Sequence, residues 1–73
     1  MENTLRARRA ALGKSFTQER VAKRVGFDHT KLSRIENGLI EPTNDEIKAL
    51  AKALKTTPSE IFPGLAEQHA EVR

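Results

Sequence analysis

Two short stripes of apolar residues, with a single glycine between them, constrain the fold of this chain more than any other feature. The stripes, both at helical spacing, are Val21, Ala22 and Val25, and then Leu32 and Ile35. Gly26 falls between them, where a helix must stop because glycine readily takes the left-handed conformation of a helix end. Residues 17–38 therefore predict two short helices joined by a sharp turn, with the small side chain of Ala22 at their crossing.

Both predicted helices carry cap signals at their starts. Thr17 and Asp28 precede the two stripes, and each has a side chain that can accept hydrogen bonds from the free N–H groups of a helix start. Phe16 and Phe27 stand just before these caps, where each can pack as a hydrophobic staple on the helix that follows. The caps and the staples therefore indicate the same two short helices joined by a sharp turn.

Caps also divide the rest of the chain into helices. The first is predicted from residue 2 or 3 to residue 12, with Gly13 as its C-cap. The fourth opens at Thr43 and the fifth at Thr57, because each of these residues begins a capping box, T-N-D-E and T-P-S-E.

Length and composition agree with one small helical domain. No segment alternates at period two, so the expected fold class is all-α. We expect a compact five-helix domain over residues 1–64, followed by a short tail or frayed helix over residues 65–73. With 73 residues the chain is near the lower size limit for an unaided hydrophobic core, and its 37% hydrophobic residues indicate a globular chain.

Composition also excludes several classes of function. The absence of cysteine removes disulfides and thiolate metal sites, and the two histidines, His29 and His69, do not complete a metal site, so no metal and no cofactor are expected. No apolar run approaches the roughly 20 residues of a membrane span, and the N-terminus is not a signal peptide, which indicates a cytoplasmic protein without a membrane partner. The net charge of +3 suits a polyanionic partner.

The stretches TQERVAKRVG and LSRIENG resemble the helix-turn-helix of the phage repressor and Cro group, the xenobiotic-response-element family of small regulators. The downstream EPTNDEIKALAKAL and TPSEIF resemble the remaining helices of that family, so the resemblance runs from about Leu5 to Phe62. It implies a lambda-repressor-like DNA-binding domain with the helix-turn-helix at helices two and three, the latter in the major groove. It also implies a sequence-specific regulator of double-stranded DNA, typically a repressor that binds a palindromic operator as a homodimer and is thereby associated with the nucleoid.

The resemblance assigns base reading to the first turn of the second motif helix and to the residue one turn further on, here His29, Thr30 and Arg34. Ser33 belongs to the same exposed face. Arg34 can pair bidentately with O6 and N7 of guanine, a contact that discriminates by about 1–3 kcal/mol; the alternative is a solvated arginine paired with Glu36 or a phosphate. His29 can donate to guanine or thymine, and Thr30 can hydrogen-bond a base edge or press its methyl group on thymine.

Contacts to the DNA backbone are expected on either side of this face. Gln18 begins the first motif helix, where N–H groups suit a phosphate oxygen and where relatives commonly contact one. Lys31 and Asn37 flank the reading face and are further candidates. Lys14 and Lys23 are weaker ones, and for each lysine the alternative is an ordinary solvated charge.

The resemblance also implies an ion pair between Arg9 on the first helix and Glu36 near the end of the recognition helix. Such a pair would fix the recognition helix against the first helix, so its role would be structural. The sequence departs from the family in two places. The connection GKSFTQ is about two residues longer than the usual turn, and Leu39 and Ile40 follow Gly38 where relatives often carry basic residues.

These apolar residues suggest how two copies of the chain could associate. Leu39 and Ile40, together with Ile61 or Leu65, could form a self-complementary patch between protomers. The alternative is that they complete the core beneath the motif.

Three classes of function compete at this point. The first is the DNA-binding regulator described above. The second is a protein-interaction module, such as the antitoxin partner of a toxin, in which DNA binding is secondary. The third, an enzyme, is disfavoured because the sequence has no clustered carboxylate pair, no nucleophile with its base and no glycine-rich phosphate loop.

Overall fold

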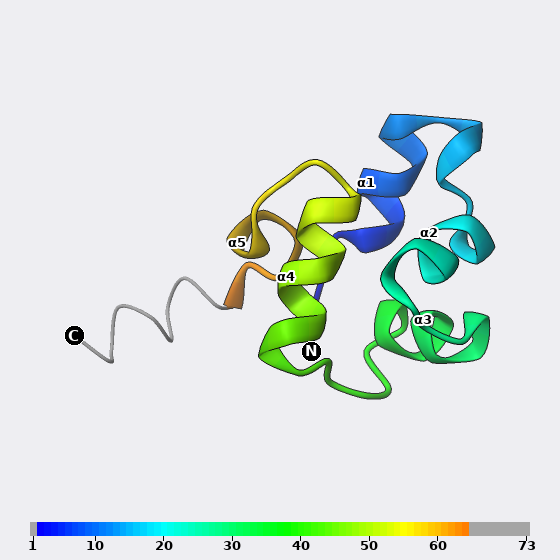
Figure 1. Cartoon of the computed structure of the whole chain (residues 1–73). Coiled ribbons are helices and arrows are strands. Elements are labelled where there is room, and N and C mark those ends of the chain that lie inside the picture. Colours follow the sequence, from blue (N-terminus) through cyan, green and yellow to red (C-terminus); the bar gives the residue numbers. More distant parts are fainter. Residues whose placement is uncertain (1, 65–73) are drawn as a thin grey trace.

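Five α-helices and one short 3₁₀ turn make up the part of the chain that the computed structural model describes, residues 2–64 (Figure 1). In chain order they are α1 (Leu5–Leu12), η1 (Lys14–Phe16), α2 (Gln18–Val25), α3 (His29–Glu36), α4 (Asn44–Ala53) and α5 (Pro58–Ile61). Helix α4 contacts α2 on one side and α5 on the other, and α2 also packs on α3. Residues 2–64 contain no strand, so the predicted all-α fold with its helix-turn-helix at α2 and α3 is confirmed. The expected tail, and with it Leu65, lies outside the described residues.

The start of α1 differs from the prediction, because the helix begins at Leu5 rather than at residue 2 or 3. The side chain of Asn3 accepts a hydrogen bond from Leu5 N at 3.2 Å and donates one to the carbonyl oxygen of Ile35 at 2.9 Å. Thr4 N donates to the carbonyl oxygen of Ile61 at 2.9 Å. Asn3 and Thr4 stay outside α1 because their polar groups form hydrogen bonds with backbone carbonyl groups of α3 and α5.

The predicted caps of α2 are confirmed. The Thr17 hydroxyl accepts a hydrogen bond from Arg20 N at 3.2 Å, and Gly26 ends the helix with φ 80°. Asp28 stands at the N-cap position of α3, but its side chain makes no capping hydrogen bond, so that part of the prediction is wrong. Asp28 is exposed, and water can solvate its carboxylate as well as the first N–H groups of the helix.

The two predicted capping boxes have different outcomes. At α4 the box is complete: Glu46 N donates to the Thr43 hydroxyl at 3.2 Å, and Thr43 N donates to Glu46 Oε1 at 2.8 Å. At α5 the box is absent, since Thr57 makes no side-chain capping bond. The Glu60 carboxylate instead accepts a hydrogen bond from the Thr56 hydroxyl at 2.7 Å, which removes it from the cap.

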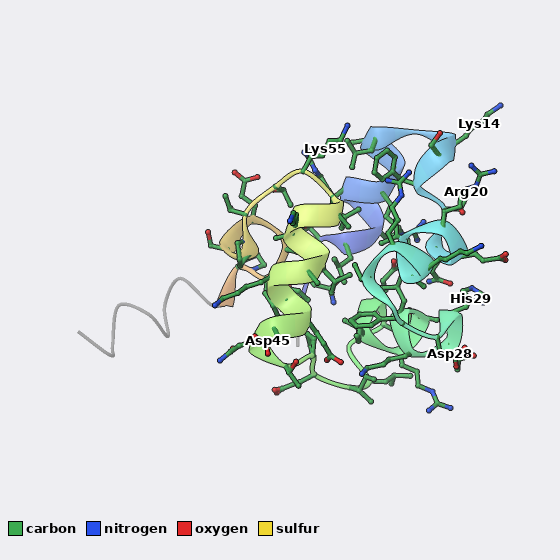
Figure 2. The ribbon with its side chains drawn as sticks, in the orientation of Figure 1. Lys14, Arg20, Asp28, His29, Asp45 and Lys55 are labelled. Atoms are coloured by element: carbon green, nitrogen blue, oxygen red, sulfur yellow. The ribbon has the colours of Figure 1, made fainter. Side chains whose placement is uncertain are left out.

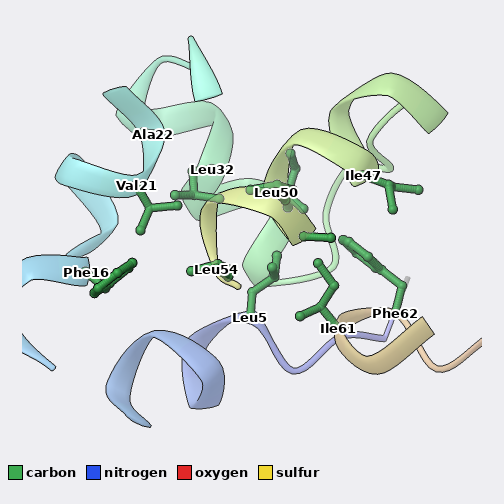
Figure 3. Close-up of a cluster of buried hydrophobic side chains, with 12 residues drawn as sticks. Leu5, Phe16, Val21, Ala22, Leu32, Ile47, Leu50, Leu54, Ile61 and Phe62 are labelled. Atoms are coloured by element: carbon green, nitrogen blue, oxygen red, sulfur yellow. The ribbon is translucent and has the colours of Figure 1, made fainter. Parts of the chain in front are cut away.

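All the helices contribute to one apolar core, shown in Figure 3. Its buried members are Leu5, Phe16, Val21, Ala22, Leu32, Ile35, Ile47, Leu50, Ala51, Leu54, Ile61 and Phe62. Ile61 is only 1% exposed, so its assignment to a dimer patch is corrected: the side chain packs inside the protomer because α5 covers the core. No helix of residues 2–64 is long and apolar enough to cross a membrane.

Arg8 fastens α1 to the C-terminal end of α4, a contact that no local sequence pattern indicates. Its Nε donates to the carbonyl oxygen of Leu54 at 2.9 Å, and its Nη2 donates to that of Lys55 at 2.8 Å. The last carbonyls of a helix have no partner within the helix, and a cation there also suits the helix dipole. Lys55 takes the left-handed conformation, with φ 57°, and the residue that adopts this conformation after a helix is usually glycine.

Candidate nucleic-acid interface

Helices α2 and α3 form a unit with one buried and one exposed face. Gly26 and Phe27 close the turn between them, where Phe27 N donates to the Ala22 carbonyl oxygen at 2.8 Å and Gly26 N donates to that of Lys23 at 3.3 Å. Leu32 and Ile35 of α3 are buried in the core. The predicted base-reading residues lie on the opposite face: His29, Thr30 and Arg34 are exposed, and Ser33 is half-buried.

A buried carboxylate fixes α3 from behind. The side chain of Glu36 is 0% exposed and receives two hydrogen bonds from Arg9, from Nε at 2.6 Å and from Nη2 at 2.9 Å. Arg9 itself is 15% exposed and also contacts the Phe16 carbonyl oxygen, with Nη1 at 3.4 Å. The structure thus brings Arg9 and Glu36 together in a bidentate ion pair that links α1 to α3.

Gln18 connects this ion pair to the exposed face of α3. Its Nε2 donates to Glu36 Oε1 at 3.0 Å, and its Oε1 lies 2.7 Å from Nε2 of His29. The first residue of α2 and the first residue of α3 are therefore joined through one amide. Figure 2 shows His29 beside Asp28 at the exposed end of the motif.

Asn37 has a partner that the sequence analysis missed. Arg6 Nη2 donates to Asn37 Oδ1 at 3.2 Å, and Arg6 Nε lies 3.9 Å from Glu36 Oε1. The Arg6 side chain is 71% exposed, so its guanidinium remains accessible at the C-terminal end of α3. No local pattern marks Arg6, because its partner is 31 positions away in the chain.

Lys31 is held against α4 rather than extended from the surface. Its Nζ donates to Glu46 Oε2 and lies 5.0 Å from the centre of the Phe27 ring. The hydrogen bond from Lys31 is the main reason that the pKa of Glu46 is lowered, and the bond from Thr43 N adds to it. A phosphate contact by Lys31 would therefore compete with this ion pair.

The remaining basic candidates lie near α2. Lys14 on η1 and Lys23 on α2 are exposed, and Arg20, which the sequence analysis did not propose, is exposed as well. In Figure 2, Lys14, Arg20 and His29 project from the same side of the molecule. Arg24 is less free, because its guanidinium stacks 4.6 Å from the centre of the Phe16 ring.

Leu39 and Ile40 stand apart from the core in the link to α4. They are 71% and 36% exposed, and they are the exposed large apolar side chains of residues 2–64. Neither completes the core beneath the motif. Within the same residues, no cluster of three or more His, Asp or Glu side chains could hold a metal ion.

Two short helices joined at a left-handed glycine, with the second exposing polar side chains from its first turn, define the helix-turn-helix class of DNA-binding domain. The sequence matches the family model described as a helix-turn-helix domain over residues 3–61, and the chain belongs to this family. No curated protein and no solved structure matched the chain.

Proposed function

We propose that this protein is a sequence-specific regulator of transcription of the repressor and Cro type, and that it acts as a repressor by occupying a palindromic operator as a homodimer. The observation that carries the proposal is the exposed first turn of α3, held from behind by the buried Arg9 and Glu36 pair. A rigid backing of this kind suits base reading, since a reading side chain needs a fixed position relative to the groove.

Base reading is assigned to the exposed side chains of α3. Arg34 is the main candidate for guanine, because its guanidinium has no ion pair or hydrogen bond within residues 2–64. Thr30 and Ser33, which precede Arg34 in α3, can also hydrogen-bond base edges. His29 contributes from the first position of the helix.

Backbone contacts surround this reading surface. The N-terminus of α2 offers free N–H groups and the second amide hydrogen of Gln18 to one phosphate. Arg6 and Asn37 form an exposed polar pair at the other end of α3, where they can bind a second phosphate. Lys14 and Lys23 add charge beside α2, and Lys31 contributes only if it leaves Glu46.

Selection of bound sites from random duplex DNA tests this function. The wild type is expected to enrich one palindrome with half-sites about 34 Å apart, the distance of one DNA turn. Arg34→Ala is expected to lose preference at one base pair in each half-site, whereas Lys48→Ala, an exposed lysine on α4, serves as the matched control. Failure of the wild type to enrich any sequence refutes the regulator and favours the interaction module, for which a toxin is the expected partner.

The homodimer is assigned to the patch of Leu39 and Ile40, because exposed neighbouring apolar side chains favour a protein contact. Sedimentation of the wild type and of Leu39→Ser with operator DNA tests it. Two wild-type protomers should bind one palindrome, and Leu39→Ser should weaken the second binding event. A single protomer on a single half-site refutes the dimer.

The same proposal includes a DNA-binding domain over residues 1–64 and a location at the nucleoid in the cytoplasm.

A further inference from the structure

The orientation of the Gln18 side chain is dictated by its buried neighbour. The Glu36 side chain is ion-paired with Arg9 and fully buried, and a carboxylate can only accept hydrogen bonds. The Gln18 atom that lies 3.0 Å from Glu36 Oε1 must therefore be the amide nitrogen, which donates. The opposite orientation would set two oxygen acceptors against each other next to a buried charge. The amide oxygen of Gln18 consequently faces His29.

This orientation determines where the imidazole of His29 carries its hydrogen. The Gln18 oxygen is an acceptor, and His29 Nε2 lies 2.7 Å from it, so Nε2 must donate. In a neutral imidazole one nitrogen bears the hydrogen and the other is an acceptor. His29 Nδ1 is thus left as an acceptor, and it makes no hydrogen bond within residues 2–64.

We propose that Glu36, acting through Gln18, makes neutral His29 a hydrogen-bond acceptor on the reading face, so that His29 selects a base with an amino group in the major groove. Those bases are adenine, through N6, and cytosine, through N4, whereas guanine and thymine present acceptors at the corresponding edge. This inference rests on the proposed function, since it concerns base selection. It replaces the expectation from the sequence that His29 donates to guanine or thymine.

Gln18 therefore acts as a positioning residue as well as a phosphate contact. The first turn of α3 then offers an acceptor at His29, and the next turn offers only donors at Arg34. The two positions read opposite hydrogen-bond patterns, with an amino-bearing base expected at the first and guanine at the second.

The hydrogen-bond step can be tested without DNA. Long-range ¹H–¹⁵N correlation spectra of the free protein distinguish a protonated Nε2 from a protonated Nδ1, and His29→Asn identifies the His29 signals beside those of His69. When its imidazole is neutral, His29 of the wild type is expected to show only the Nε2–H form. Gln18→Ala is expected to shift both nitrogens toward a mixture of the two forms, whereas Glu19→Ala, the neighbouring exposed residue of α2, leaves them unchanged. Identical His29 shifts in the wild type and in Gln18→Ala would overturn the positioning role.

Base selection is tested by enrichment from random duplex DNA with the wild type and with His29→Ala. The base position that loses preference in the variant identifies the base read by His29. We expect the wild type to favour adenine or cytosine there by roughly tenfold, the effect of one hydrogen bond gained or left unmade. Guanine or thymine at that position, or no position affected by His29→Ala, overturns the proposal.

The two measurements separate the possible failures. If neither protein enriches a sequence, base selection by His29 fails together with the proposed function. If a palindrome is enriched but the spectra show the Nδ1–H form, the function stands and the role of Glu36 and Gln18 is overturned.

Discussion

Removal of the Arg9 side chain should destabilise the whole domain, because it leaves a carboxylate uncompensated in the interior. Arg9→Ala deletes two short hydrogen bonds to Glu36, of 2.6 and 2.9 Å. Breaking a buried ion pair from one side costs about 3–5 kcal/mol. Two groups soften the loss, since Gln18 still donates at 3.0 Å and Arg6 lies 3.9 Å away. We therefore expect the lower end of that range, about 3 kcal/mol.

That loss is large for a protein of this size. A chain of 73 residues has a free energy of unfolding of about 4–11 kcal/mol at 0.05–0.15 kcal/mol per residue. A loss of about 3 kcal/mol lowers the melting temperature of such a domain by about 12–24 °C. The assay is thermal unfolding followed by far-ultraviolet circular dichroism at neutral pH, with urea unfolding as the second measure.

Two further variants make the Arg9 result interpretable. Arg20→Ala removes an exposed arginine and is expected to change stability by less than about 0.5 kcal/mol. The double change of Arg9→Met with Glu36→Met removes both charges and should be less destabilising than Arg9→Ala, because no buried charge is left unpaired. If Arg9→Ala has the same melting temperature as Arg20→Ala and the wild type, the ion pair of Arg9 and Glu36 contributes nothing to stability and the reasoning is refuted.

Three other changes test separate parts of the fold, each by urea unfolding. Lys55→Gly should raise the free energy of unfolding by about 1 kcal/mol, because glycine takes φ 57° without the strain of a side chain; a decrease would contradict this. Arg8→Ala should cost about 2 kcal/mol, since it leaves two carbonyls at the end of α4 without their charged donor, and an unchanged midpoint would exclude that role. The pKa of Glu46 is lowered in the folded protein, mainly by the hydrogen bond from Lys31, so the stability it adds is present above its unfolded pKa and is lost as the pH falls through the folded value. The stability difference between wild type and Glu46→Gln should therefore shrink with acidification, and a difference constant across the acid range would refute the linkage.

The sequence predicts best those features that depend on neighbouring residues. Thr17, Gly26 and the capping box at Thr43 act on backbone groups within a few positions, and all three occur as predicted. Asp28 and Thr57 have the same kind of local signal, yet neither side chain caps its helix. A side chain that can cap a helix can instead be solvated, or its partner can bond to another group. Which of these occurs depends on the three-dimensional environment, which a local sequence pattern does not describe.

Local sequence patterns do not predict contacts between distant parts of the chain. Asn3 lies outside α1 because its amide reaches Ile35, 32 positions away, and Arg8 reaches Leu54, 46 positions away. The pairing of Arg9 with Glu36 was expected from family resemblance, since no spacing in the sequence implies it. The link from Glu36 through Gln18 to His29 could not be foreseen, because it requires the relative placement of two helices, α2 and α3.

The buried carboxylate of Glu36 also divides the reading face into residues that can and cannot change independently. His29 is joined to the interior through Gln18, so a replacement there must suit the amide as well as the base. Thr30 and Arg34 are exposed, and their side chains make no hydrogen bond within residues 2–64. Under the proposed function, changes at Thr30 and Arg34 can alter base preference without removing a contact of the fold, whereas a change at His29 also removes its hydrogen bond with Gln18.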